Sequence, residues 1–460
     1  MTTFAAPPNT VPPATVPDAP GGLPLLGHIP HIAQNPLAFF MGLQKVGPVV
    51  RVRIATHTSY VVNSPELARR LHTTDQDLFD KGGPVFDRVR PYVGNGLASC
   101  PAHDHARQRP AMQPAFQRGR IERYAEVMTA TADEVTSSWR PGQTLDLYKE
   151  MHRLTTLVIG RTLISADQAD PAARHIAQAV PDIMRGVYWR MIIPSRVFAS
   201  LPIPVNRRYE EVTAHTRKVV DKVVDHYLAD GSDYGDLLSM VVAACKDEPD
   251  PHSAVYDQVV TFLTAGLESV ASSLTHTLRL LYRNPEVLGR LRAELQEVLG
   301  GGAGEEPRLP GYDDMPRLRY TQNVITEGLR LYPPAWISSR VATEDIPWEQ
   351  GGIPAGAGVF FSPYALHRDP SVFAAPDAFD PDRWSTERVT NVQRQGYFAL
   401  GAGRRKCIGD VFGTVEATIA LATILTRWRL LHPASSADAK PTVTALLLPP
   451  RTLVRVERNR

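Results

Sequence analysis

The sequence predicts a mainly α-helical fold with a small β region. Residues 118–165 and 169–230 read as amphipathic helices, and residues 253–282 carry an apolar stripe at steps of three and four. Residues 51–54 and 59–62 are short alternating or apolar runs around a polar turn, which is typical of a β-hairpin. Long helices therefore dominate, and strands are few and short.

Composition narrows the class of protein. The chain has 460 residues, of which 43% are hydrophobic and 21% charged, so it can bury a large core. Its net charge of +2 indicates no general attraction to nucleic acid or to anionic membranes. The three cysteines, Cys100, Cys245 and Cys407, show no paired spacing, which predicts no disulfide framework and a reducing, cytoplasmic location.

The beginning of the chain differs from the rest. Residues 1–30 are rich in proline, and we expect residues 1–20 to form an extended, poorly ordered tail. No apolar run is long enough to span a bilayer, so we expect no transmembrane anchor. Length alone would suggest two or three domains, but the motifs described below are spread over residues 105–409 and must meet in one site. We therefore expect a single domain over residues 21–460.

The segment from Leu400 to Gly409 holds the most informative motif. Cys407 follows two glycines and a basic run, and an apolar helical pattern starts directly after it. The positive end of a helix and neighbouring basic residues both favour a thiolate over a thiol. Gly401 and Gly403 leave room for a flat group close to the backbone. Taken alone, the segment is also compatible with an ordinary buried cysteine after a turn.

This segment resembles the haem-binding loop of the cytochrome P450 family, whose pattern is aromatic-Gly-x-Gly-x-Arg-x-Cys-x-Gly. Leu400 stands where the family usually has an aromatic residue, and the other positions match at Gly401, Gly403, Arg405, Cys407 and Gly409. The resemblance extends from about residue 20 to the end, with five motifs in the expected order. It implies the P450 fold, a triangular prism, and a haem b group whose iron is bound by Cys407.

Basic residues that the resemblance assigns to the haem propionates lie in separate segments. His105 and Arg109 are four residues apart, so they share a helix face and can bind one anion. The family uses this pair for a propionate, and Arg340 matches the arginine that binds the second. Together with Arg405 they would neutralise two buried carboxylates. The competing pair with the same spacing is His103 and Arg107.

A glycine lies in the middle of the predicted helix over residues 253–282. Gly266 costs about 1 kcal/mol relative to alanine there, so a second reason for it is expected. The resemblance places Ala265 and Gly266 over the haem, where a local distortion of the helix makes room for O2. It assigns Glu268 and Ser269 to proton delivery, with serine in place of the usual threonine.

Glu327 and Arg330 lie three residues apart on a helix that ends at a pair of prolines. Alone, such a pair is an ordinary salt bridge of little weight. The resemblance adds Arg383, which follows in the segment Phe379–Trp384, and implies a buried triad that supports the haem loop.

The substrate pocket is predicted from mostly apolar residues. The loop over residues 80–98 is rich in glycine, proline and apolar side chains, and the resemblance makes it a pocket-lining loop. Apolar, proline-containing segments at residues 188–194 and 197–205 are predicted to be a helix end on the core, a lid over the channel, or both. A C-terminal hairpin around Pro449 would reach into the pocket. The predicted lining residues are Phe86, Val89, Tyr92, Leu263, Leu267, Trp336, Ile337, Leu447 and Leu448.

The reaction implied by the resemblance is monooxygenation of a C–H bond with O2. Electrons would come from a ferredoxin and its reductase, docking near residues 404–406. Parts of the chain look similar to actinobacterial P450 enzymes that oxidise sesquiterpenes in antibiotic pathways, which favours a terpene substrate and a role in secondary metabolism. The alternatives are a fatty-acid or polyketide hydroxylase, a haem-thiolate sensor or binding protein without turnover, and a haem-thiolate isomerase or peroxide-using enzyme.

Overall fold

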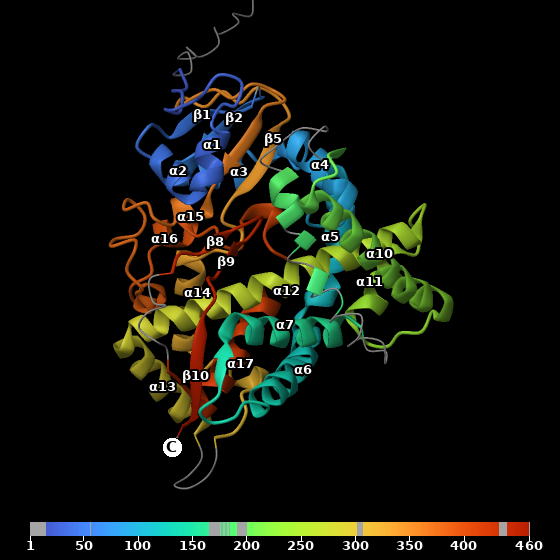
Figure 1. Cartoon of the computed structure of the whole chain (residues 1–460), viewed down its shortest axis with the longest axis vertical. Helices are drawn as coiled ribbons and strands as arrows, with labels where there is room; N and C mark the ends of the chain where they lie inside the picture. Colours follow the sequence, from blue (N-terminus) through green and yellow to red (C-terminus); the bar gives the residue numbers. More distant parts are fainter. Residues whose placement is uncertain are drawn as a thin grey trace, which may run out of the picture.

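The structure is a computed structural model that describes residues 15–55, 57–164, 175, 178–179, 182–183, 185–190, 200–300, 307–431 and 439–459. Within these residues, helices form most of the molecule. The five-stranded sheet that contains β1, β2 and β5 lies at the top of Figure 1, whereas β10 of a second sheet lies near the other end. The predicted mainly α-helical class with a small β region is confirmed.

Several helices begin at proline, with a preceding side chain that caps the free backbone N–H groups. Asn35, Ser64 and Asp250 each accept a hydrogen bond from the backbone of the first turn. The helices described are α1 (Ile29–Gln34), α2 (Pro36–Leu43), α3 (Pro65–His72), α4 (Gly83–Val93), α5 (Ala102–Met112), α6 (Arg118–Ser137), α7 (Leu147–Leu163), α10 (Pro204–Asp230), α11 (Leu237–Cys245), α12 (Pro251–Arg283), α13 (Pro285–Leu299), α14 (Arg319–Leu331), α15 (Pro363–Leu366), α16 (Asn391–Gly396) and α17 (Asp410–Arg427). Short 3-10 turns include η1 (Gln76–Leu78), η2 (Gln113–Phe116), η4 (Pro381–Trp384) and η5 (Gly403–Arg405).

The described strands form three small sheets. The first has the order β1-β2-β6-β5-β3, and its strands are β1 (Val49–Ile54), β2 (His57–Val62), β3 (Phe79–Asp80), β5 (Ser338–Ala342) and β6 (Gly358–Phe361). The second has the order β4-β10-β7, from β4 (Thr144–Asp146), β7 (Trp428–Leu431) and β10 (Leu453–Arg458). The third pairs β8 (Thr442–Val443) with β9 (Leu447–Leu448). The predicted hairpin is present as β1 and β2, which pair Val49 with Val62 and Ile54 with His57.

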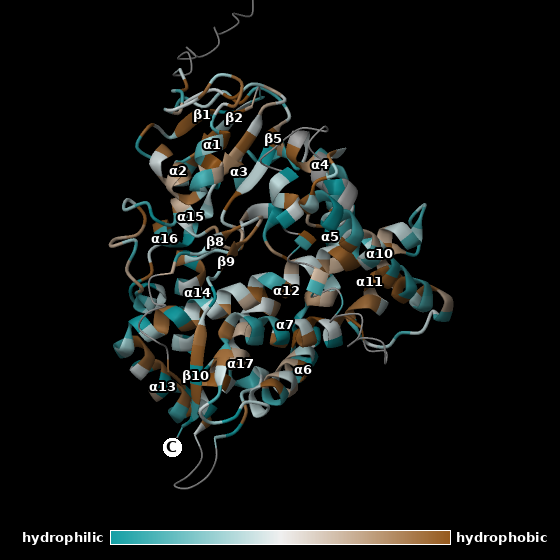
Figure 2. Ribbon diagram, in the orientation of Figure 1, coloured by the Kyte–Doolittle hydropathy of each residue, from teal (hydrophilic) through white to brown (hydrophobic). Residues whose placement is uncertain are grey.

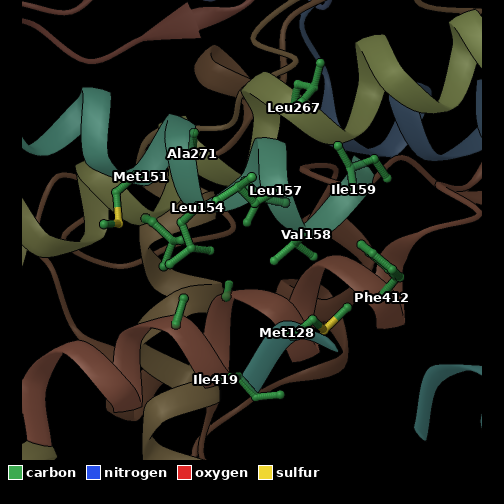
Figure 3. Close-up of a cluster of buried hydrophobic side chains, with 14 of the residues drawn as sticks. Met128, Met151, Leu154, Leu157, Val158, Ile159, Leu267, Ala271, Phe412 and Ile419 are labelled. Carbon is green, nitrogen blue, oxygen red and sulfur yellow. The ribbon is translucent and has the colours of Figure 1, made fainter. Parts of the chain in front are cut away.

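Helix α12 crosses the middle of the molecule and contacts α7, α10, α11, α14 and α17 (Figure 1). Apolar residues line the contacts between these helices, whereas polar residues predominate on the outer surfaces (Figure 2). Figure 3 shows the centre of the core, where Leu154 and Val158 of α7 lie between α12 and α17. Close packing of this kind stabilises the fold and holds α12 in place.

Residues 15–20, which were expected to belong to an extended tail, contact the folded domain. The N–H of Ala19 donates to the carbonyl of Arg51, and the N–H of Arg51 donates to the carbonyl of Pro17, each at 2.8 Å. Asp18 also forms an ion pair with Arg51 at 2.6 Å. Residues 15–20 are therefore bound along β1, because their backbone groups find partners on that edge of the sheet.

Two further expectations differ from the structure. Residues 83–93, expected as part of a loop, form helix α4, which begins next to Pro84 and ends at Gly94 with φ of +75°. The C-terminal hairpin around Pro449 is absent, because β9 pairs with β8 while β10 pairs with β4 and β7. The two segments predicted as a helix end on the core, a lid or both, 188–194 and 197–205, are described in part, and residues 191–194 and 197–199 lie outside the described residues.

In the part of the chain that the structure describes, every helix is too short or too polar to cross a membrane.

Candidate active site

The loop that carries Cys407 is closed by its own backbone. The N–H of Cys407 donates to the carbonyl of Leu400 at 2.8 Å, and the N–H of Gly401 donates to the carbonyl of Phe398 at 3.0 Å. Gly401 and Gly403 have φ of +69° and +63°, a region that residues with a side chain rarely adopt. A Cβ atom at Gly403 would also overlap the carbonyl oxygen of His72. Both glycines are therefore required by the turn and by its contact with α3.

The Cys407 thiol is accessible to solvent, whereas Cys100 and Cys245 are buried. Protein atoms nevertheless surround it closely, and burial raises the pKa of the Cys407 thiol. The N–H of Gly409 and the charges of Arg109 and Lys406 oppose this increase without cancelling it. The helix start and the basic run thus act in the expected direction, and burial is the larger effect. A bound metal ion would favour the thiolate further.

Arg109 binds the cysteine loop directly. Its Nη1 donates to the carbonyl of Lys406 at 2.6 Å, and its Nε donates to Gln113 Oε1 at 3.1 Å. Arg109 therefore supports the loop backbone, and the propionate contact that the sequence predicted for it stays a prediction.

A cluster of cationic side chains lies next to the loop. It combines the predicted residues His105, Arg340 and Arg405 with Lys81, which the sequence analysis did not identify. Arg405 forms an ion pair with Asp80 at 3.1 Å and donates to the carbonyl of Cys100 at 2.8 Å. Arg340 and Lys81 donate to the backbone carbonyls of Ser339 and Ala98.

The cluster carries more positive than negative charge. Burial, followed by the charge of Arg405, lowers the pKa of Arg340 to about 10. Burial, followed by Arg405 and Lys81, lowers the pKa of His105 to about 3, so this histidine is neutral near pH 7. Burial and the charges of Arg340 and Arg405 also lower the pKa of Lys81. The competing pair is outside the cluster, because exposed His103 lies 3.4 Å from Asp104 and Arg107 forms ion pairs with Asp104 and Glu248.

The middle of α12 presents a short accessible face. Ala265 is exposed and Gly266 and Ser269 are partly exposed, although most of α12 is buried. The Ser269 hydroxyl donates to the carbonyl of Ala265 at 2.6 Å. The helix is assigned without a break from Pro251 to Arg283, so the expected local distortion does not interrupt it.

The packing of α12 against α7 also favours a glycine at position 266. A Cβ atom at this position would lie 3.1 Å from Cδ1 of Ile159 on α7, which is tighter than ordinary contact. The glycine therefore allows α12 to approach α7. The adjacent Glu268 is completely buried, and its Oε1 lies 3.6 Å from Nε2 of His152 on α7.

Glu327, Arg330 and Arg383 meet in a buried cluster. Arg330 donates to both carboxylate oxygens of Glu327 at 2.8 Å, and Arg383 donates to Oε1 at 3.4 Å. The Trp384 indole N–H donates to Glu327 Oε2 at 2.8 Å. This carboxylate therefore accepts hydrogen bonds from two cations and an indole, which compensates for its burial.

His367 connects this cluster to the cysteine loop. Its Nδ1 lies 2.9 Å from the carbonyl of Arg330, and its Nε2 accepts the N–H of Phe398 at 2.8 Å. The proton therefore resides on Nδ1. Burial lowers the pKa of His367 to about 3, which keeps this neutral form near pH 7.

The predicted pocket residues do not share one surface. Leu263, Leu267, Trp336 and Leu447 are buried in hydrophobic clusters, and the Trp336 indole donates to the carbonyl of Thr444 at 2.9 Å. Leu263 and Leu267 belong to one cluster, and Trp336 and Leu447 belong to another, so their place in a pocket stays a prediction. Residues that stay partly accessible are Phe86, Ile337 and Leu448. The side chains of Val89 and Tyr92 lie outside the described part.

These observations define a class of protein: a helical protein with one accessible cysteine on a glycine-containing loop, a cluster of cations beside it, and a long helix with a small-residue face. A reachable thiol and an excess of positive charge fit an iron porphyrin with two carboxylates.

Comparison with known proteins agrees with this class. A model of the family "Cytochrome P450" matches residues 17–455. Cyclooctatin synthase of Streptomyces melanosporofaciens is 43% identical over 92% of this chain and 91% of its own. Pentalenene oxygenase of Streptomyces avermitilis is 38% identical over 95% of each chain. A crystal structure of the cytochrome P450DA heme domain superposes with a TM-score of 0.84 at 26% identity, covering 98% of this chain and 99% of that one.

The chain belongs to the cytochrome P450 family. Its fold and its class of enzyme, a monooxygenase, are those predicted from the sequence. Membership implies haem as cofactor, redox partners that supply electrons, and a hydrophobic substrate.

Replacing Glu327 by glutamine tests the buried cluster. Glu327→Gln leaves Arg330 and Arg383 buried without a carboxylate, so we expect the free energy of unfolding to fall by about 3–5 kcal/mol. Denaturant titration of the haem-loaded protein measures it, and Glu297→Gln, on the exposed face of α13, is the control. An unchanged midpoint for Glu327→Gln would contradict the assigned role.

Replacing Arg340 by glutamine tests whether the cation cluster binds carboxylates. A hydrogen bond to a charged group contributes about 1.5–3 kcal/mol, so we expect Arg340→Gln to release haem about tenfold faster or more. The haem-free variant should be as stable to heat as the haem-free native protein, because the substitution removes one of several cations that repel one another. Haem transfer to an acceptor protein and thermal denaturation measure the two effects, with exposed Arg394→Gln as control. Equal haem retention in both variants would refute the assignment.

Proposed function

We propose that this chain is a haem b monooxygenase that inserts one oxygen atom of O2 into a C–H bond of a terpene in secondary metabolism. Three relatives that it resembles over most of its length carry names for such compounds: cyclooctatin synthase, cyclooctat-9-en-7-ol 5-monooxygenase and pentalenene oxygenase. Identity of 38–43% supports the same class of substrate. Residues 21–460 would act as one catalytic domain.

The observation that carries the proposal is the accessible Cys407 thiol next to an unbalanced group of cations. Cys407 would bind the iron, and His105, Arg340, Arg405 and Lys81 would hold the propionates. When bound, a haem with a thiolate ligand supplies the chemistry for O2 activation. Leu400 accepts the N–H of Cys407 through its carbonyl, so its side chain is not needed to close the loop.

The residues of α12 would shape the other side of the haem. Ala265 and Gly266 present little bulk on the accessible face, which leaves room for a small molecule. The Ser269 hydroxyl can donate a proton toward that space when it leaves its bond to the Ala265 carbonyl. Glu268 would resupply protons from behind the helix. Phe86, Ile337 and Leu448 would contact an apolar substrate.

Ferredoxin is the proposed electron donor, and its docking site would lie at Arg404 and Lys406. Both side chains are about half exposed beside the cysteine loop. Arg404 pairs with Asp77, and Lys406 pairs with Asp410 at 2.5 Å. A more acidic partner would compete with these surface pairs, which are weak in water.

Optical titration tests the haem ligand and the substrate together. We expect reduced, carbon monoxide-treated protein to show a thiolate-haem spectrum that Cys407→Ser loses and Cys245→Ser keeps.

With a panel of cyclic terpenes, the ferric protein should shift from low to high spin as water is displaced. A shift with long-chain acyl compounds only would replace the terpene by a fatty acid or polyketide. Product formation should require ferredoxin rather than peroxide alone.

A charge reversal tests the docking site. Lys406→Glu should weaken ferredoxin binding and reduce its dependence on salt, because one positive contact becomes repulsive. Lys222→Glu, exposed on α10, is the matched control. Equal affinity and salt dependence for Lys406→Glu and the native protein would place docking elsewhere.

A further inference from the structure

Polar groups of α7 lie against the buried side of α12, directly behind Ser269. The Glu268 side chain is 0% exposed. Neither of its carboxylate oxygens has a hydrogen bond within the described residues. Burying a carboxylate without a hydrogen bond is costly, so a donor on a neighbouring element is expected to approach it.

His152 on α7 is the partner that the geometry offers. Its Nε2 lies 3.6 Å from Glu268 Oε1 and also lacks a hydrogen bond within the described chain. This separation is longer than a hydrogen bond, and a shift of less than about 1 Å would form one. Thr155 holds the two helices together nearby, because its hydroxyl donates to the carbonyl of Leu267 at 2.9 Å.

Tyr148 completes the cluster one turn earlier on α7. Its ring lies 6.0 Å from that of His152, and burial, followed by the Glu268 carboxylate, raises its pKa. Tyr148 therefore keeps its proton and can donate to Glu268 but cannot supply a charge. The other carboxylate acting on Tyr148 is Asp146 of β4, which pairs with Arg451 at 3.6 Å.

The exposed fractions of His152 and Glu268 show which of the two lies nearer to solvent. The His152 side chain is 17% exposed, so it contacts solvent, whereas Glu268 does not. Ser269 follows Glu268 in the helix and lies on the accessible face. Solvent, His152, Glu268 and Ser269 thus form a sequence from the surface to the site.

We propose that His152 is the entry point for protons, receiving them from solvent and passing them to Glu268 behind the haem site. The inference rests on the proposed function, in which Glu268 and Ser269 deliver protons. In each step the imidazolium Nε2–H bond breaks and an O–H bond forms on Glu268 Oε1. The neutral imidazole then keeps its proton on Nδ1, and its bare Nε2 is buried, so the ring must rotate to bring Nε2 to solvent, take a proton from water there and turn back. No electron moves. His152 acts through Glu268 and is a positioning residue rather than a catalytic one.

The competing explanation is that His152 merely tethers α7 to α12. Two variants separate these roles in the haem-loaded enzyme with its redox partners. His152→Gln removes the titratable group and keeps a polar side chain, whereas Thr155→Val removes a real tether and leaves the titratable groups intact. His226→Gln on α10 is a surface control.

Product formed per electron consumed is the first readout, because poor proton supply diverts electrons to peroxide. A general acid that acts directly on the reacting group raises the reaction rate by about 10²–10⁴-fold. His152 would act one proton transfer before that group, so we expect His152→Gln to lower the yield by a smaller factor, about two- to tenfold. The native yield should fall as pH rises through the range where histidine loses its proton, and the variant should lose that dependence and show a larger solvent isotope effect. Thr155→Val should keep the native pH profile. An unchanged yield and pH profile in His152→Gln would overturn the proposal.

A second readout does not depend on turnover. Nuclear magnetic resonance of histidine-labelled, reduced and carbon monoxide-bound protein can follow the ring nitrogen signals of His152. Glu268→Gln replaces the carboxylate that lies 3.6 Å from Nε2, so these signals should shift. Unchanged signals mean that the two groups do not interact, and the proposal fails.

If Glu268→Gln itself leaves product yield unchanged, the proposed relay fails. If only His152→Gln leaves it unchanged, the relay stands and this inference fails.

Discussion

The buried Glu327 carboxylate is the interaction on which the position of Cys407 depends. It binds Arg330, whose carbonyl accepts from His367, and His367 in turn accepts the N–H of Phe398 at the start of the cysteine loop. The loop then closes on itself between Leu400 and Cys407. The links from Glu327 to His367 are buried hydrogen bonds, so removing one of these side chains leaves a buried polar partner without its bond.

Next to this loop, the positive charges of Arg340, Arg405 and Lys81 exceed the negative charge of the nearby Asp80. Within the described residues, Asp80 is the acidic partner of Arg405. Burial and the neighbouring positive charges lower the pKa values of Arg340 and Lys81, and they keep His105 neutral. Such an arrangement is unfavourable for the protein alone and becomes favourable when a dianion is bound. The folding energy of the rest of the chain therefore holds the site in a state that suits its cofactor.

The sequence predicted those parts of the site that depend on local spacing. The glycines and Cys407 lie within one short segment, and Glu327 and Arg330 share a helix face. Lys81 was missed because only the tertiary fold brings it beside Arg405. Leu263 and Leu267 were assigned to the pocket from their apolar character, and the structure buries both in the large hydrophobic cluster. Helix α4 was taken for a loop because its glycine and proline lie at the ends, where they start and stop a helix.

Consecutive residues on α12 carry two different tasks, because neighbouring side chains on a helix point about 100° apart. Ser269 is on the accessible face, while Glu268 faces α7 and has no direct contact with solvent. In the proposed relay, a proton would reach this carboxylate from α7, where the partly exposed His152 adjoins it. The packing that Gly266 permits between the two helices therefore also brings the outer part of this route close to the site.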